Sequence, residues 1–163
     1  VLAAFDSPRY RQLVAELDPT VLLTGIRFEI ASADLSVANL ESPLTDLPHD
    51  PASGPNALEA APFSARLLAA AGFDAVGVAN NHAGDAGPAT VGDTVDALAA
   101  AGLTAIGAGT SVDGAYEPRS VEIDGVRVAL LAFDATGAGP RAPARCAPAR
   151  PPRASGWGAR RGL

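Results

Sequence analysis

The sequence contains no lysine, no methionine, a single cysteine and only 5% aromatic residues. The lone Cys146 excludes an intramolecular disulfide and a metal site built from several cysteines. The missing methionine predicts that the natural start of the chain lies upstream of Val1. The sequence shows neither a signal-peptide core nor an apolar run long enough for a bilayer, and with the start missing this leaves membrane association and compartment (cell envelope or cytoplasm) open.

The charge of the chain is divided unevenly along its length. Residues 1–134 hold all 18 acidic residues and six of the 12 basic ones, a net charge of −12, whereas residues 135–163 hold six arginines and no acid. An acidic body argues against a nucleic-acid partner, because phosphate binding requires basic side chains. The Arg/Pro-rich segment lacks apolar periodicity, so we predict one domain over 1–134 and a disordered basic tail over 135–163. Two origins remain open for this tail, a natural basic extension or translation out of frame.

Hydrophobic residues make up 48% of the sequence and come mostly from Ala, Val and Leu, which favours helices layered on a sheet. A helix, a glycine and a short apolar run occur twice in succession, at 62–79 and at 90–109. This alternation predicts an α/β fold with a mostly parallel central sheet. Further expectations are a helix after Ser7-Pro8, a strand at 35–38, a surface loop at 46–57, a turn at 107–109, and a hairpin at 120–133 that turns at Asp124-Gly125.

Polar side chains follow two of the predicted strands. Asn39 and Glu41 come after "LSVA", and Asn80, Asn81 and His82 come after "VGVA". If these strands are parallel neighbours, the two groups converge at the carboxyl edge of the sheet, where α/β proteins bind ligands. Carboxylate, amide oxygen and imidazole together suit a divalent ion such as Mn, Mg, Zn or Fe. The other interpretation is an ordinary turn, since Asn often bonds the nearby backbone in turns.

Four segments follow one another in the order "ADLSVANLESPLTD", "GFDAVGVANNHAGDAG", "TVDALAAAGLTAIGAG" and "GVRVALLAF", and together they extend over roughly residues 30 to 134. In this order they resemble the CapA family of bacterial proteins linked to poly-gamma-glutamate capsule synthesis. The resemblance implies a relation to calcineurin-like metallophosphoesterases, with a layered α/β sandwich and a two-metal site. Capsule-synthesis proteins are the partners that it implies.

The resemblance also implies roles for individual residues. Asn81 would bind metal and His82 would act as the catalytic acid, while Glu41, with Asn39, would stand at the second acidic motif. Asp85 would either orient His82 from outside the metal's ligand set or serve only as a turn residue. The family's opening Gly-Asp strand and its later histidines are missing from this sequence, so the resemblance predicts a partial sandwich with an incomplete two-metal site.

Three functions follow as alternatives. The chain derives from a metal-dependent phosphoesterase-like hydrolase, or it is a non-catalytic binding or assembly component of capsule production, or it is a non-functional truncated remnant.

Overall fold

The computed structural model describes residues 12, 16, 18, 21, 23–47 and 57–136. Its helices and strands, in chain order, are α2 (Arg27–Ser32), β1 (Val37–Asn39), α3 (Ser64–Ala71), β2 (Ala75–Gly77), α4 (Thr90–Ala100), β3 (Thr104–Ile106), α5 (Val112–Tyr116), β4 (Arg119–Ile123) and β5 (Val126–Leu130). Most of the helix expected after Ser7-Pro8, most of the loop expected at 46–57, and the basic tail from residue 137 onward lie outside the described residues.

Strands β1, β2 and β3 form a parallel sheet in that order. Ala38 lies opposite Val76, which in turn lies opposite Ala105. The predicted α/β class and parallel central sheet are therefore confirmed, and the strands before the two polar groups are direct neighbours. Strand β1 begins two residues later and ends one residue later than the predicted 35–38, so that Asn39 is its last residue rather than the first residue after it.

Each helix of the repeated unit ends at a glycine that turns the chain toward the next strand. Gly72 follows α3 with a φ of 107°, and its backbone N–H bonds to a carbonyl in the last turn of the helix. Gly102 follows α4 with a φ of 80°. Left-handed backbone of this kind is easy only for glycine, which explains why the same "AAG" ending recurs before β2 and β3.

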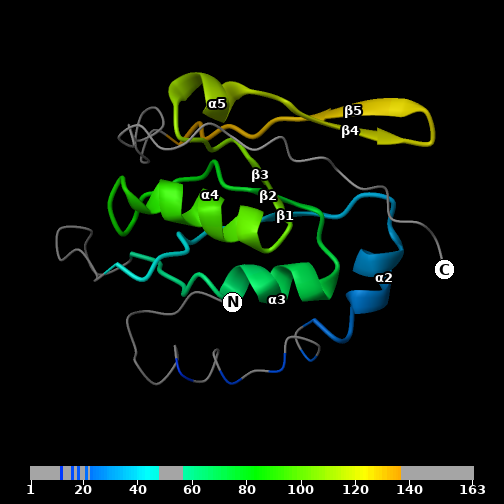
Figure 1. Cartoon of the computed structure of the whole chain (residues 1–163), viewed down its shortest axis with the longest axis horizontal. Helices are drawn as coiled ribbons and strands as arrows, with labels where there is room; N and C mark the ends of the chain where they lie inside the picture. Colours follow the sequence, from blue (N-terminus) through cyan, green and yellow to red (C-terminus); the bar gives the residue numbers. More distant parts are fainter. Residues whose placement is uncertain are drawn as a thin grey trace.

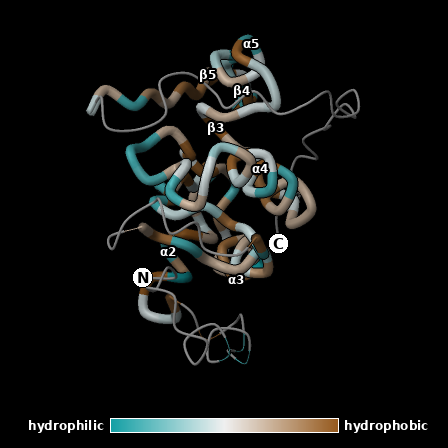
Figure 2. Tube along the Cα trace, turned by 90° about the vertical axis from the view of Figure 1, so that its left-hand side faces the viewer, coloured by the Kyte–Doolittle hydropathy of each residue, from teal (hydrophilic) through white to brown (hydrophobic). Residues whose placement is uncertain are grey.

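The core lies between the parallel sheet and the two longer helices. Leu68 of α3 and Leu98 of α4 pack in one cluster with Val76, Val78 and Ala105 of the sheet region. In Figure 1 the parallel strands β1, β2 and β3 lie between α3 below and the hairpin with α5 above. Figure 2 shows hydrophobic segments running through this middle part of the molecule.

The second sheet is an antiparallel hairpin of β4 and β5. Its turn residues, Asp124 and Gly125, have φ values of 48° and 79°, as a tight two-residue turn with both central residues left-handed requires. The hairpin predicted from Asp-Gly is thus confirmed, and Figure 1 shows it projecting beyond the parallel sheet. Within the described part of the chain, no helix combines the length and hydrophobicity that a bilayer crossing needs.

The chain returns from the hairpin to the end of the parallel sheet. A methyl group added to Gly107, just after β3, would lie 2.6 Å from the carbonyl oxygen of Ala132 and 2.7 Å from the Cβ of Ala79. The segment after β5 therefore lies against the residues that follow β2 and β3. Gly107 also has a φ of 74°, so both the backbone conformation and the close approach require glycine.

Candidate functional site

The residues that follow β1 and β2 are joined by the side chain of Asn80. Its Nδ2 donates to Asn39 Oδ1 over 3.2 Å and to the carbonyl oxygen of Leu40 over 2.8 Å. Its Oδ1 accepts a hydrogen bond from the backbone N–H of His82 over 3.0 Å. One amide thus links the last residue of β1, the loop after β1 and the loop after β2. The two polar groups predicted to converge are in contact.

His82 is held by a carboxylate three residues further along the chain. Its Nδ1 lies 2.7 Å from Asp85 Oδ2, and the same oxygen accepts the backbone N–H of Leu58 over 2.7 Å. Because an ionised carboxylate only accepts hydrogen bonds, Nδ1 carries the proton, and Nε2 is the ring nitrogen that remains for a ligand. The side chains of His82 and Asp85 are 24% and 16% exposed, so the pair is partly shielded from water.

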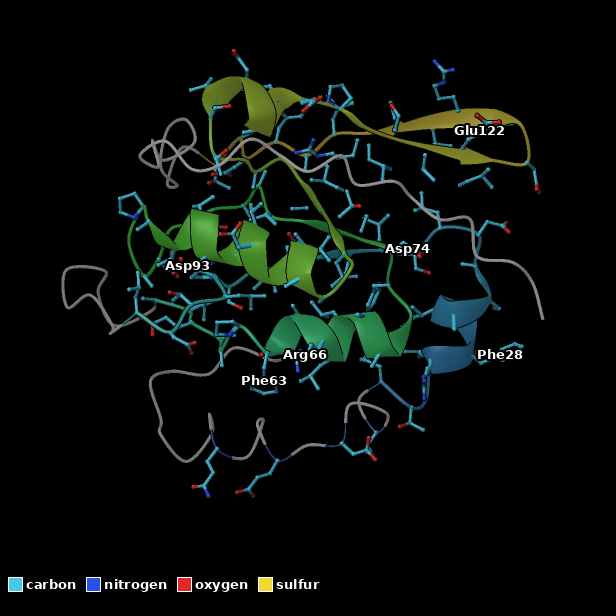
Figure 3. The ribbon with its side chains drawn as sticks, in the orientation of Figure 1. Phe28, Phe63, Arg66, Asp74, Asp93 and Glu122 are labelled. Atoms are coloured by element: carbon cyan, nitrogen blue, oxygen red, sulfur yellow. The ribbon has the colours of Figure 1, made fainter. Side chains whose placement is uncertain are left out.

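The loop after β1 is fixed to helix α4 as well. The buried hydroxyl of Thr94 accepts the backbone N–H of Leu44 over 2.9 Å and donates to the carbonyl oxygen of Thr90 over 2.7 Å. Asp93, the residue before Thr94, accepts a hydrogen bond from the hydroxyl of Thr45 over 2.6 Å. Figure 3 shows Asp93 on α4, to the left of Asp74, which precedes β2. These bonds place the loop after β1 at the carboxyl edge of the sheet.

A second contact supports the same loop from the segment at 57–60. Thr45 donates its backbone N–H to the carbonyl of Ala60 over 3.0 Å, and Ala60 donates to the carbonyl of Pro43 over 3.0 Å. Leu44 and Ala60 form a parallel bridge, and both are buried. Since Leu58 in this segment also bonds Asp85, the segment connects the loop after β1 with the His82–Asp85 pair.

The five site residues predicted from the sequence lie at this edge. Asn39 and Glu41 are exposed, and Asn81, His82 and Asp85 are half-buried. The structure brings Asn39 to Asn80 and His82 to Asp85 through the hydrogen bonds given above. The metal-binding, catalytic and orienting roles of these residues stay predictions.

The donor chemistry of these residues fits a divalent cation. Glu41 offers a carboxylate and Asn39 and Asn81 offer amide oxygens, which are ligands that hard cations accept. Asn39 Oδ1 takes one hydrogen bond from Asn80, and an amide oxygen has a second lone pair for a cation. Among residues 23–47 and 57–136, no three His, Cys, Asp or Glu side chains gather in one place. The cation would therefore depend on the asparagines.

Sequence reasoning did not separate the two asparagines of "NNH". It placed Asn81 among the metal ligands and gave Asn80 no role of its own, but Asn80 is the residue that joins the two loops. Asn80 and Asn81 lie beyond the last residue of β2, Gly77, so strand alternation gives no signal that distinguishes them. The contact of Leu58 with Asp85 left no sequence signal, since a backbone donor can belong to any residue type.

Comparison with family models matches residues 4–161 to the bacterial capsule synthesis protein PGA_cap. The chain belongs to this family. The resemblance to CapA proteins predicted from four sequence segments is confirmed, and the match extends well beyond the segments that suggested it. A search of curated proteins gave no match.

Proposed function

We propose that this capsule synthesis family member acts through a divalent-cation centre at the carboxyl edge of its parallel sheet, with phosphoester hydrolysis or a closely related reaction as its chemistry. The observation that carries the proposal is the 2.7 Å contact between His82 Nδ1 and Asp85 Oδ2. A histidine whose proton position is set by a carboxylate is prepared for proton transfer at its other nitrogen. Family membership supports capsule synthesis as the process.

The proposed ligands of the cation are Glu41, Asn81 and Asn39. A cation bound there would stabilise negative charge on a phosphoryl oxygen and supply a nucleophile from water near neutral pH. In its doubly protonated, positively charged form, His82 would donate a proton from Nε2 to the leaving oxygen. Asp85 would stabilise the positively charged imidazole that delivers this proton, because its carboxylate already bonds Nδ1.

Hydrolysis of p-nitrophenyl phosphate and of its bis-ester by the purified protein tests this proposal. Metal is first removed with a chelator, and Mn²⁺, Mg²⁺, Zn²⁺ or Fe²⁺ is then added back. We expect turnover that depends on one of these ions and that falls about 10²- to 10⁴-fold in His82→Ala, the range that general acid catalysis contributes. Unchanged turnover in His82→Ala would reject the catalytic role of this residue.

Asp85→Asn tests whether Asp85 orients His82. A control substitution shows what the loss of one negative charge elsewhere on the molecule does. The substitution keeps the size of the side chain but removes the negative charge beside Nδ1, so we expect a clear loss of kcat. Asp96→Asn is the matched control, because Asp96 is exposed on α4 and undergoes the same chemical change. Equal activity of the two variants would show that Asp85 is a turn residue only.

A non-catalytic binding or assembly role in capsule production is the second candidate. The aromatic rings of Tyr116 and Phe133 lie 6.1 Å apart, and the two residues are 57% and 63% exposed. Exposed aromatic side chains are enriched at protein interfaces, so a capsule-synthesis protein is the partner that this pair would contact. Capsule output in cells distinguishes the candidates: loss in a Tyr116→Ser/Phe133→Ser variant with normal output in His82→Ala favours assembly, and the reverse favours catalysis.

A further inference from the structure

The hydrogen bonds of Asn80 engage both ends of its side-chain amide. Both Nδ2 protons have acceptors, Asn39 Oδ1 and the Leu40 carbonyl, and Oδ1 receives the His82 N–H. Reversing the amide would set its oxygen against two other oxygens and its NH₂ group against an N–H. The orientation is therefore fixed by three partners that agree with one another.

A side chain held by three hydrogen bonds within the protein already has a structural role. The amide nitrogen of Asn80 does not coordinate hard cations, and its Oδ1, which keeps a second lone pair as Asn39 Oδ1 does, is directed at the backbone N–H of His82. Asn81, the next residue, has no such set of bonds to give up in the described structure. Of the two adjacent asparagines, Asn80 is thus held by hydrogen bonds within the protein, and Asn81 is the better candidate for a metal ligand.

We propose that Asn80 is a positioning residue that sets the Asn39–Glu41 segment in register with His82, so that the ligands from one loop and the acid from the other face the same substrate. This inference rests on the proposed cation centre for its functional consequence. Its structural part, the coupling of the two loops through one amide, does not depend on any metal. Residues that orient metal ligands without touching the ion typically change affinity about 10- to 100-fold when replaced.

The same substitution at the two neighbouring asparagines gives a test with opposite expected signs. Asn80→Asp keeps the size of the side chain and the acceptor for His82, but it replaces both donors with oxygen. We expect Mn²⁺ binding, measured by titration calorimetry, to weaken about 10- to 100-fold. Asn81→Asp replaces a neutral ligand with a charged one, and we expect binding that is unchanged or tighter, because affinity rises with ligand charge.

The sign of the first change decides between the two roles of Asn80. The added negative charge of Asn80→Asp would by itself attract a cation, so weaker binding requires that the lost donors matter more. Tighter binding, or binding equal to that of the unsubstituted protein, would show that the lost donors do not outweigh the added charge. Either result overturns the proposal.

Nuclear magnetic resonance without metal tests the coupling independently of the cation centre. In the unsubstituted protein, the side-chain NH₂ of Asn80 should exchange with solvent more slowly than that of Asn81. In Asn80→Asp the His82 amide should stay protected while the resonances of Asn39 shift, and in Asn80→Ala both should change. If Mn²⁺ does not bind but these signatures appear, the cation centre is wrong and the coupling stands. Fast exchange of the Asn80 amide would refute the coupling without any variant.

Discussion

Gly107 should be the least replaceable of the glycines that lie near the candidate site. An added methyl group would lie 2.6 Å from the Ala132 carbonyl oxygen and 2.7 Å from the Ala79 Cβ, closer than real Cβ atoms come to such neighbours. Both neighbours are backbone or the first side-chain carbon, so neither can rotate away. Gly107→Ala must move the segment after β5 or the end of β2.

The expected destabilisation has two parts. Placing a non-glycine residue at a φ of 74° costs about 1–2 kcal/mol. Forcing an extra methyl group into packed surroundings adds about 1–3 kcal/mol. Together these give about 2–5 kcal/mol, a large share of the roughly 5–15 kcal/mol by which a domain is stable. Thermal and urea unfolding followed by circular dichroism measure this change.

Gly102→Ala is the matched control for the backbone part. Gly102 has a φ of 80°, and an added methyl group would meet nothing within 4 Å. We expect Gly102→Ala to lose only about 1–2 kcal/mol, the cost of the left-handed backbone alone. The two variants should therefore differ by about 1–3 kcal/mol in unfolding free energy. Equal losses would show that the close approach of Ala132 to Gly107 is absent, and the described path of the chain after β5 would be wrong.

Three further changes test other parts of the same description. Thr94→Val removes the acceptor of the buried Leu44 N–H, so unfolding should become easier by about 1–3 kcal/mol, whereas Thr94→Ser, which keeps the hydroxyl, should lose less. Leu98→Ala leaves a cavity beneath the sheet and should cost about 2–5 kcal/mol in urea unfolding. Hydrogen bonds from the backbone N–H and then the hydroxyl of Thr136 lower the pKa of Asp134 below its ordinary 3.8, so Thr136→Ala, which removes only the hydroxyl, should raise this pKa part of the way in a carboxyl NMR titration. Because the folded pKa is depressed, any stability that this turn provides is present above pH 3.8 and is lost as the pH falls through the lowered value.

The parallel sheet was predictable because its signals are local and repeated. Both helix–glycine–strand units contain an apolar helix face, a left-handed glycine and a short buried strand, and each signal points to the same fold. The hairpin was predictable for a similar reason, since Asp124-Gly125 suits one turn geometry strongly. In these segments the conformation that the local sequence favours is the one that the tertiary structure requires.

Helices α2 and α5 were not predicted because nothing in their sequence repeats. α2 has six residues and α5 has five, too few for an apolar pattern to repeat, and neither helix has a buried residue. α5 begins at Ser111, whose side chain accepts the Gly114 N–H, but a serine cap before a five-residue helix containing glycine is a weak signal. The contact of α2 with α3 occurs where Ala31 lies close to Gly72, and small residues leave no pattern that marks such an approach.

The candidate site was predictable as a location but not as a set of bonds. Two strands ending in polar residues were sufficient to place Asn39 and His82 at the same edge, because parallel strands end on the same side. Which amide would turn toward which loop depends on distances across the sheet that no single segment contains. Asp93 and Thr94 illustrate this limit, because they lie about fifty positions from their partners, Thr45 and Leu44.

Three polar residues follow the buried strand β2 because each residue meets a different requirement at the edge of the sheet. Beyond Val78 the chain leaves the ladder, and its backbone groups need partners that the next strand no longer supplies. Asn80 satisfies that need for both loops at once, and Asp85 does the same for Leu58 while fixing the tautomer of His82. Neither the side chain of Asn81 nor the Nε2 of His82 takes part in these hydrogen bonds. Asn80 thus stabilises the edge of the sheet, whereas Asn81 remains available to a cation. For this reason Asn80→Asp and Asn81→Asp should have opposite effects on Mn²⁺ affinity.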